Sequence, residues 1–283
     1  MRRWILLLLC LSIQVQAGTM QVSGYVAVEA TAFVSDAAYT DQFDGVQAAL
    51  IGQPEFHYET ADRRDQYSLI PFAHLDSQDQ RRTHADLREA WWLHIADNWE
   101  LLVGVNRVFW GVAESSHLVD IINQTDQVEN IDGEDKLGQP MLKLAFQRDW
   151  GELELFVLPG FRERTFPGKD GRLRFPLVID GKALYSNSQK QRHVDLAARY
   201  SHYIGDWDFG LSVFHGTGRE PRFIPNAAVT RFFAVYDIID QVSVDIQYTY
   251  NSWLWKFEGL RRSQNGENFF AGVGGFEYTL YQI

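Results

Sequence analysis

Ser115, Ser116 and His117 place two hydroxyl groups beside an imidazole, the residue types of a hydrolase that forms a covalent intermediate. Adjacency along the chain is not triad geometry, because nucleophile and base must meet through a hydrogen bond in the folded protein. No Gly-x-Ser-x-Gly segment occurs, and the eight histidines are scattered. We therefore predict no catalytic residue and no enzyme, with an outer-membrane lipase or protease as the weaker alternative.

A stretch rich in carboxylates comes next and superficially suggests calcium. Its acidic residues are Asp126, Glu129, Asp132, Glu134 and Asp135. Their spacing does not match the helix–loop–helix calcium pattern, in which the ligands occupy set positions of one short loop. We therefore expect a solvated acidic loop, and the sequence predicts neither a metal nor a cofactor.

Ionisable residues also recur at the polar positions of segments whose other positions are apolar. These residues are His84, Asp86, Arg88, Glu154, Asp195, Arg199, Asp245, Lys256 and Glu258. Their signs are mixed, and in a membrane barrel they would line the lumen. Two interpretations stay open: a ladder of charge pairs that braces the wall, or a set that selects solutes at a constriction.

Strands are the elements that must position these side chains. Alternation with period two is typical of strands, and it is clearest at 241–250, where Val242 and Ile246 oppose Ser243. Pro71 makes the third strand the weakest, because proline cannot donate to a sheet ladder. The pattern predicts twelve strands, at about 22–34, 47–59, 66–76, 84–96, 100–110, 141–148, 151–161, 193–204, 207–215, 241–250, 253–261 and 269–283.

Tryptophans recur beside the short polar turns. The predicted aromatic girdle consists of Trp99, Trp150, Trp207, Trp253 and Trp255. Indole is stable at a lipid–water boundary, where it is apolar on one side and wet on the other. Long connections at about 111–139, 162–192 and 216–240 all fall at the opposite end. These features together predict an all-β, antiparallel transmembrane β-barrel with short periplasmic turns and long outer loops.

Hairpin register follows from matching faces, since directly opposed residues point the same way. The turns predict three apolar pairs: Leu144 with Leu155, Tyr200 with Leu211, and Tyr248 with Trp255. In the hairpin that follows residue 84, a three-residue turn predicts Leu93 opposite Val103. That register also brings Glu89 opposite Arg107 on the apolar, lipid-facing side. We expect an ion pair there; the alternative is a β-bulge that turns one of the two inward.

The first long connection carries an apolar cluster of its own, Leu118, Val119, Ile121 and Ile122. Burial of such side chains needs an apolar partner surface. The loop can obtain it by folding inward, where it would narrow a pore, or by packing on the rim as a lid. The sequence leaves both arrangements open.

The N-terminus has the pattern of a signal peptide at residues 1–17, followed by the barrel domain at 18–283. Arg2 and Arg3 precede the apolar segment Trp4–Leu11, and Val15-Gln16-Ala17 resembles a cleavage site. A membrane anchor is the alternative, although eight apolar residues are too few to span a bilayer as a helix. A second is lipidation at Cys10, but Leu9 stands where a small residue is expected.

Cleavage would remove the sole cysteine, and with it any disulfide of the mature chain. It would also leave 24 basic against 37 acidic residues, so the net charge would move from −11 to −13. An acidic chain argues against a nucleic-acid partner. No later stretch has the roughly 18 consecutive apolar residues of a transmembrane helix.

Several segments resemble a large group of Gram-negative outer-membrane porin-like proteins. They are LREAWW from Leu87, VNRVFWG from Val105, LVDIINQTDQVENID from Leu118, REPRFIP from Arg219, WLWKFEG from Trp253 and GGFEYTLY from Gly274. The resemblance spans most of the mature chain. It implies the barrel fold and an outer-membrane location, but no established substrate, and it transfers no functional residue.

We therefore expect an outer-membrane channel for passive or modestly selective passage of small solutes. A non-conducting structural or adhesive barrel is the alternative. The expected partners are the lipid bilayer, lipopolysaccharide, the barrel-assembly machinery and small solutes. The C-terminal Tyr281-Gln282-Ile283 runs out of phase with Phe276 and Tyr278, whereas complete barrels usually end in a lipid-facing aromatic residue. We accordingly expect a parent barrel of roughly 14–18 strands.

Overall fold

The described part of the computed structural model, residues 11–15 and 18–280, is dominated by one antiparallel sheet of thirteen strands. Its neighbours in order are β1 Leu11–Val15, β2 Gly18–Ala32, β3 Val46–Thr60, β4 Asp65–Asp76, β5 His84–Ile95, β6 Trp99–Asn106, β7 Gln139–Arg148, β8 Gly151–Pro159, β11 Val194–Ile204, β12 Trp207–Thr217, β15 Ile238–Tyr250, β16 Trp253–Gln264 and β17 Glu267–Tyr278. All twelve predicted strands are present, so the all-β antiparallel prediction is confirmed. No helix in this part of the chain is long and apolar enough to cross a bilayer.

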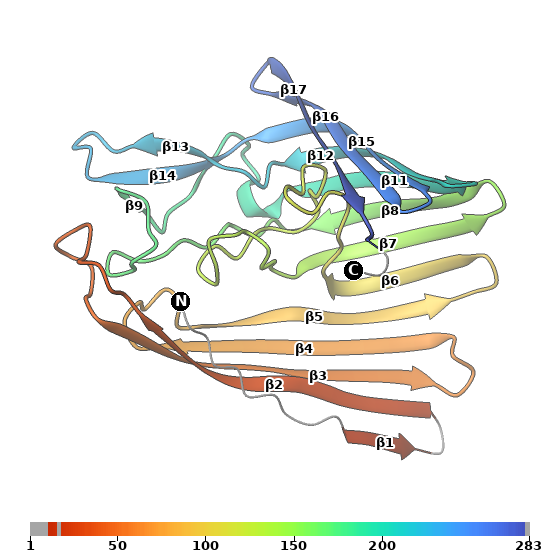
Figure 1. Ribbon diagram of the computed structural model, residues 1–283, viewed down its shortest axis with the longest axis horizontal. Helices are drawn as coiled ribbons and strands as arrows, with labels where there is room; N and C mark the ends of the chain where they lie inside the picture. The colour runs from red at the N-terminus through yellow and green to blue at the C-terminus, as the bar shows by residue number, and fades with distance from the viewer. Residues whose placement is uncertain (1–10, 16–17, 281–283) are drawn as a thin grey trace.

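The sheet is curved and open. Figure 1 shows its strands bending around the loop that joins β6 to β7. Within the described residues β1 and β17 are the two edges, and the predicted twelve strands do not close by pairing β2 with β17. The strand β1 lies inside the predicted signal peptide and pairs with β2. Arg2, Arg3, Cys10, Ala17 and the C-terminal Tyr281-Gln282-Ile283 lie outside the described residues.

Each long strand presents one apolar face and one polar or packed face. The outward face carries large apolar side chains that are half exposed, such as Val28 (66 %), Leu211 (50 %) and Phe257 (46 %). The three predicted cross-strand pairs at the Trp-bearing turns are all observed, and the turns have two residues as expected. Period-two alternation therefore set the faces of these hairpins correctly.

The β5–β6 hairpin differs from the prediction. Leu93 faces Leu102 and Trp91 faces Gly104, so the predicted pairing of Leu93 with Val103 is wrong by one residue. The expected ion pair nevertheless exists, because Arg107 Nη2 lies 3.1 Å from Glu89 Oε1. It stands on the inner side rather than the lipid-facing side.

A β-bulge explains this inversion. The β4–β5 register shifts between Ile70 and Pro71, so that Ile70 faces Glu89 while Pro71 faces Leu87. Proline has no N–H to donate, and a bulge is the usual way to accommodate it inside a sheet. The extra residue, Arg88, reverses the faces of β5 beyond it. Glu89 consequently points inward, where it accepts a hydrogen bond from buried Ser68.

The inner loop (residues 107–138) folds onto the concave face of the sheet. Val119, Ile121 and Ile122 are almost fully buried against strand residues such as Phe156 and Phe214. The apolar cluster of the loop is therefore satisfied by folding inward, and the rim-lid alternative is wrong. Burial of this size is worth roughly 1.5–3 kcal/mol for each large side chain.

The remaining long connections meet in a second, small sheet at the same end. It contains β9 Val178–Ile179, β10 Leu184–Tyr185, β13 Arg222–Pro225 and β14 Arg231–Tyr236, with one 3-10 turn at Lys190–Arg192 nearby. Asp237 anchors the β13–β14 hairpin through Arg222, Gln264 and Asn265. Burial raises the pKa of Asp237, but these three contacts outweigh it and hold the pKa below its ordinary value.

Candidate functional site

The concave side of the sheet holds the candidate site. All nine predicted lumen residues lie on this side, and most of them contact a partner rather than open space. Arg199 binds Asp245 through two hydrogen bonds of 2.6 and 2.8 Å, and Lys143 pairs with Glu154 at 3.0 Å. These are links between strands and thus part of the wall.

A cavity of about 630 Å³ lies at the short-turn end, between the sheet and the inner loop. Its lining includes Arg199, Asp245, Glu152 and Asp208 from the strands and Val112 from the inner loop. The lining is therefore polar and of mixed charge. A cavity of this size and polarity can hold many waters or a small hydrophilic solute.

Glu258 of β16 lies against Gly111 and Val112, two of the residues that line this cavity. It is fully buried, and its Oε1 accepts hydrogen bonds from the backbone N–H groups of Val112 (2.7 Å) and Ala113 (2.8 Å). Its Oε2 accepts a third from Val119 at 3.1 Å. Gly111 sits so close that a Cβ there would lie 2.4 Å from Glu258 Oε1, which explains the glycine after Trp110. One carboxylate thus holds the inner loop against the far strand of the sheet.

Asp195 and Arg219 form a second buried anchor for the inner loop. Its Oδ2 pairs with Arg219 at 2.6 Å, and the same guanidinium donates to the carbonyl oxygen of Ile122 in the inner loop. Arg219 is 3 % exposed, and it stacks over Phe214 and Phe161. The inner loop is therefore attached to β11 by charge as well as by apolar packing.

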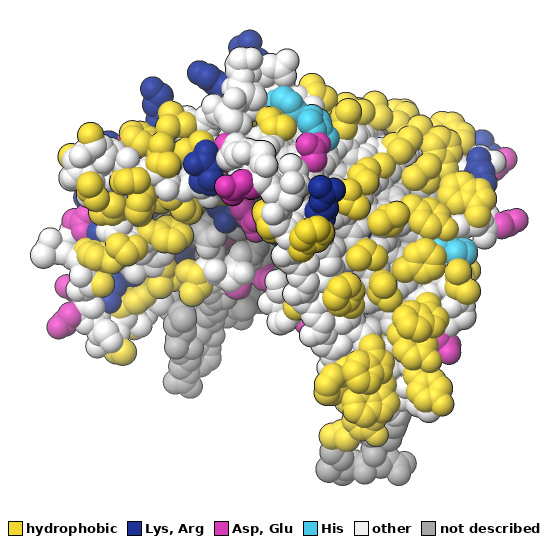
Figure 2. Space-filling model, turned by 90° about the horizontal axis from the view of Figure 1, so that it is seen from above, with side chains coloured by type: hydrophobic (Ala, Val, Ile, Leu, Met, Phe, Trp, Pro, Cys, Tyr) yellow, Lys and Arg dark blue, Asp and Glu magenta, His cyan; other side chains and the backbone are white. Residues whose placement is uncertain are grey.

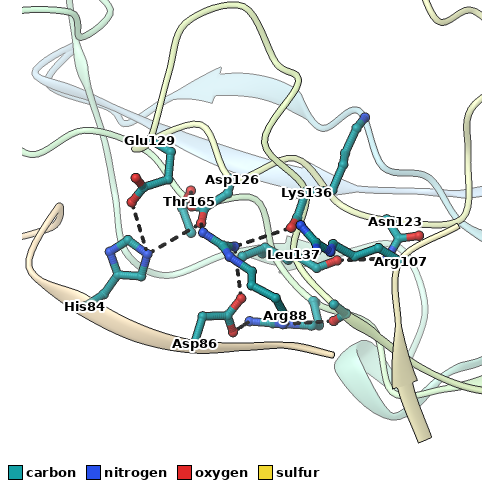
Figure 3. A network of polar contacts seen from close by, with 12 residues as sticks. His84, Asp86, Arg88, Arg107, Asn123, Asp126, Glu129, Lys136, Leu137 and Thr165 are labelled. Carbon is teal, nitrogen blue, oxygen red and sulfur yellow. Dashed lines mark hydrogen bonds and ion pairs between the residues drawn. The ribbon is translucent and has the colours of Figure 1, made fainter. Parts of the chain in front are cut away.

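A third polar network lies at the long-loop end, where β5 meets the inner loop (Figure 3). Arg88 bridges Asp86 at 3.0 Å and Asp126 at 2.7 Å, and Arg162 also binds Asp86. Burial raises the pKa of Asp126, but contacts with His84, Arg88 and Thr165 outweigh this and hold that pKa at about 2. Asp126 is therefore ionised at neutral pH.

Burial of Asp126 corrects the expectation of a solvated acidic loop. Asp126 is 0 % exposed, and the side chain of Glu129 is only 9 % exposed. Asp132, Glu134 and Asp135 are exposed as predicted. Asp126 and Glu129 directly follow the buried segment of the inner loop and are shielded from solvent with it. The other three acids come later in the loop and face solvent.

Residues that sequence reasoning missed come from loops. Arg162 and Arg219 supply the partners of predicted strand residues, yet no period marks them, because loop residues reach their partners through tertiary packing. Asp126, which the sequence analysis assigned to a solvated loop, is the partner of Arg88. Lys256, by contrast with the buried strand residues, pairs with two exposed carboxylates, Glu114 of the inner loop and Glu277 of β17. His117 of the Ser115–His117 segment lies 2.9 Å from Glu134.

The tryptophans that the sequence analysis assigned to an aromatic girdle lie on the outer side of the short-turn end. Trp150, Trp207, Trp253 and Trp255 are each between about one third and one half exposed. Trp207 stacks on Tyr248 with ring centroids 4.3 Å apart, and Trp253 lies 4.7 Å from Tyr278. Trp99, at the start of β6, contacts His94. Figure 2 shows apolar side chains spread over the sheet face that it views.

No protein-family model matches the chain, and no curated protein sequence matches it.

Proposed function

We propose that the protein is an outer-membrane β-barrel with a porin-like, narrowed channel for small hydrophilic solutes. One observation carries the proposal: the same strands expose an apolar face outward and bury an ion-paired, polar face around an infolded loop. A water-soluble protein rarely exposes apolar patches beyond a few hundred Å². In a bilayer the outer face would contact lipid, and the aromatic cluster at the short turns would lie at the periplasmic boundary.

The two free edges bear on the barrel part of the proposal. An unpaired strand edge in lipid costs several kcal/mol for each unmet backbone group. We therefore expect both edges to be paired in the membrane. Removal of the predicted signal peptide would take away β1 and leave β2 as the edge opposite β17. Cysteines at Ala27 in β2 and Val273 in β17, which both lie on the concave face, test direct closure. A disulfide in the membrane fraction would mean that these two strands meet, whereas no disulfide would favour pairing of each edge with another strand.

The channel part rests on the mixed-charge cavity beside Arg199 and Asp245. It would form a vestibule that the inner loop narrows. Planar-bilayer recording of the refolded chain should show discrete current steps. Because Asp208 lines the cavity, Asp208→Asn should lower the preference for cations.

Asp206→Asn is the matched control, because Asp206 lies in the neighbouring turn, outside the residues that line the cavity. Its selectivity should equal that of the parent chain. Equal ion selectivity of the channels formed by the two variants would mean that ions do not pass the vestibule.

A second candidate is a non-conducting barrel, and the buried cluster around Val119 and Ile122 favours it. This cluster and the Glu258 anchor fill the middle of the concave side. Complete absence of current, from a chain shown to be inserted by its protection from protease, would support this candidate and refute the channel.

A further inference from the structure

His84, Asp126 and Glu129 bring one imidazole and two carboxylates together at the start of β5. His84 Nε2 lies 3.4 Å from Asp126 Oδ2 and 3.4 Å from Glu129 Oε1, and the three ligand-type atoms all lie within 4.8 Å of one another. Figure 3 shows both carboxylates directed toward the ring. The three residues come from a strand and a loop, so the fold itself assembles the cluster.

The tautomer of His84 follows from its other nitrogen. Nδ1 lies 3.0 Å from the carbonyl oxygen of Arg82, and a carbonyl can only accept, so Nδ1 carries a proton. In the neutral ring the Nε2 lone pair then faces two anionic oxygens. Such an arrangement is repulsive unless a proton or a metal ion lies between the three atoms.

Distance separates these two solutions. A proton on Nε2 would give N–H···O contacts of 3.4 Å, beyond the usual range of about 2.7–3.2 Å, and neither Nε2 nor Glu129 Oε1 has a hydrogen-bond partner. Metal–ligand bonds of about 2.1 Å place tetrahedral ligands about 3.4 Å apart. The observed spacing of His84 from each carboxylate therefore fits a metal ion better than a proton.

Each of the three groups is also fixed from behind. His84 Nδ1 donates to Arg82, His74 Nδ1 lies 2.8 Å from Glu129 Oε2, and Thr165 donates to Asp126 Oδ1 at 2.6 Å. Metal ligands are characteristically oriented by such outer hydrogen bonds, which leave the remaining atom free to coordinate. Here all three candidate ligands have this support. His84 Nε2 and Glu129 Oε1 have no hydrogen-bond partner, whereas Asp126 Oδ2 also pairs with Arg88 at 2.7 Å and would share that oxygen with the ion.

The charge of the surroundings permits a cation despite the nearby arginines. The carboxylates are Asp76, Asp86, Asp126 and Glu129, and the guanidinium groups paired with them are Arg82, Arg88 and Arg162. The carboxylates therefore outnumber the guanidinium groups by one. A cavity of about 270 Å³, lined in part by Thr83, Val128 and Thr165, borders the cluster and offers a route for the ion.

We propose that His84, Asp126 and Glu129 bind one divalent first-row transition-metal ion, with Zn²⁺ as the best match, and that this ion fastens the inner loop to β5. An imidazole with carboxylates suits Zn²⁺ and its neighbours, whereas Ca²⁺ takes oxygen ligands alone. The site goes beyond the proposed channel, because it requires only the contact between loop and strand.

Metal-free full-length chain, refolded in detergent, is titrated with Zn²⁺ alone, and bound metal is counted by mass spectrometry. One Zn²⁺ for each chain is expected, with Ca²⁺ unable to displace it. His84→Gln and the nearly isosteric Glu129→Gln should abolish stoichiometric binding. Thr165→Val, which removes only the outer hydrogen bond to Asp126, should weaken binding roughly 10- to 100-fold.

His117→Gln is the matched control, because His117 pairs with a carboxylate in the same loop but outside the cluster. It should bind Zn²⁺ like the parent chain. Circular dichroism verifies that every variant is folded, and Co²⁺ absorption in the parent reports a nitrogen–oxygen site independently of the variants. No saturable Zn²⁺ uptake by the parent, uptake equal in Glu129→Gln, or preference for Ca²⁺ would each overturn the proposal.

Discussion

Glu258→Gln tests whether one buried carboxylate holds the inner loop. Glu258 accepts three backbone hydrogen bonds from that loop, and it has no exposure to solvent. Glutamine has nearly the same shape, but it offers one acceptor oxygen and an NH₂ group. The oxygen can keep Val112 and Ala113, whereas the NH₂ group must then face the N–H of Val119, donor against donor.

The cost follows from the three bonds. A hydrogen bond to a charged group contributes about 1.5–3 kcal/mol and a neutral one about 1, so the two retained bonds weaken by roughly 2 kcal/mol together. The third is lost, and leaving a buried donor unsatisfied costs a further 1–3 kcal/mol. We expect the loop to be destabilised by about 3–5 kcal/mol, or roughly two to nearly four orders of magnitude in its opening equilibrium.

Hydrogen exchange read by mass spectrometry measures this opening directly in a peptide that spans residues 110–120. Protection of that peptide should fall by the factor above, while peptides from β2 and β3 should be unchanged. Glu114→Gln is the matched control, because Glu114 is an exposed carboxylate of the same loop that pairs with Lys256. Its protection should match that of the parent chain. Equal protection in the two variants would refute the anchoring role of Glu258.

Three further outcomes are expected. Gly111→Ala should loosen the same peptide, because φ is +122° there and the added Cβ would meet Glu258 Oε1 at 2.4 Å; unchanged exchange would contradict it. Asp237, whose folded pKa is lowered, stabilises the β13–β14 hairpin above its unfolded pKa of about 3.9, and this stability is lost as pH falls through the lower folded value. Cleavage of that hairpin by an acid-active protease should therefore begin only below about pH 4 and should occur at higher pH in Asp237→Asn. Finally, a cysteine at Asp132 should react with an impermeant reagent on intact cells and one at Asp149 should not; the reverse pattern would invert the assigned sidedness.

Sequence periodicity was sufficient wherever a strand lies flat in a regular ladder. Tyr200 with Leu211 and Tyr248 with Trp255 were predictable because a two-residue turn and an apolar face together allow one register. The predicted register of the β5–β6 hairpin was wrong because Pro71, on the neighbouring strand β4, forces a bulge at Arg88. A defect in one strand thus changes the faces of the next, and reasoning on single hairpins cannot detect it.

The sequence predicted the strand residues of the candidate site but not their partners in the loops. The strand residues Asp86, Arg88, Asp195 and Glu258 stand out through their polar positions on alternating segments. Their partners Asp126 and Arg219, and the three N–H groups bound by Glu258, belong to loops. The positions of loop residues depend on packing across the whole sheet. The spacing of residues along the chain therefore could not predict that His84 contacts Asp126 and Glu129.

The Glu258 anchor also dictates an order of events during synthesis. It joins residues 139 to 146 positions apart, so the inner loop is made long before the strand that receives it. Contacts of such high sequence separation form late, after the loop-closure entropy has been offset by the strands between. Until β15 is in place, Val119 and Ile122 lack part of their apolar cover, which includes Ile239. The inner loop therefore docks fully only after most of the sheet has been made, and the nascent chain must be shielded from aggregation in the interval.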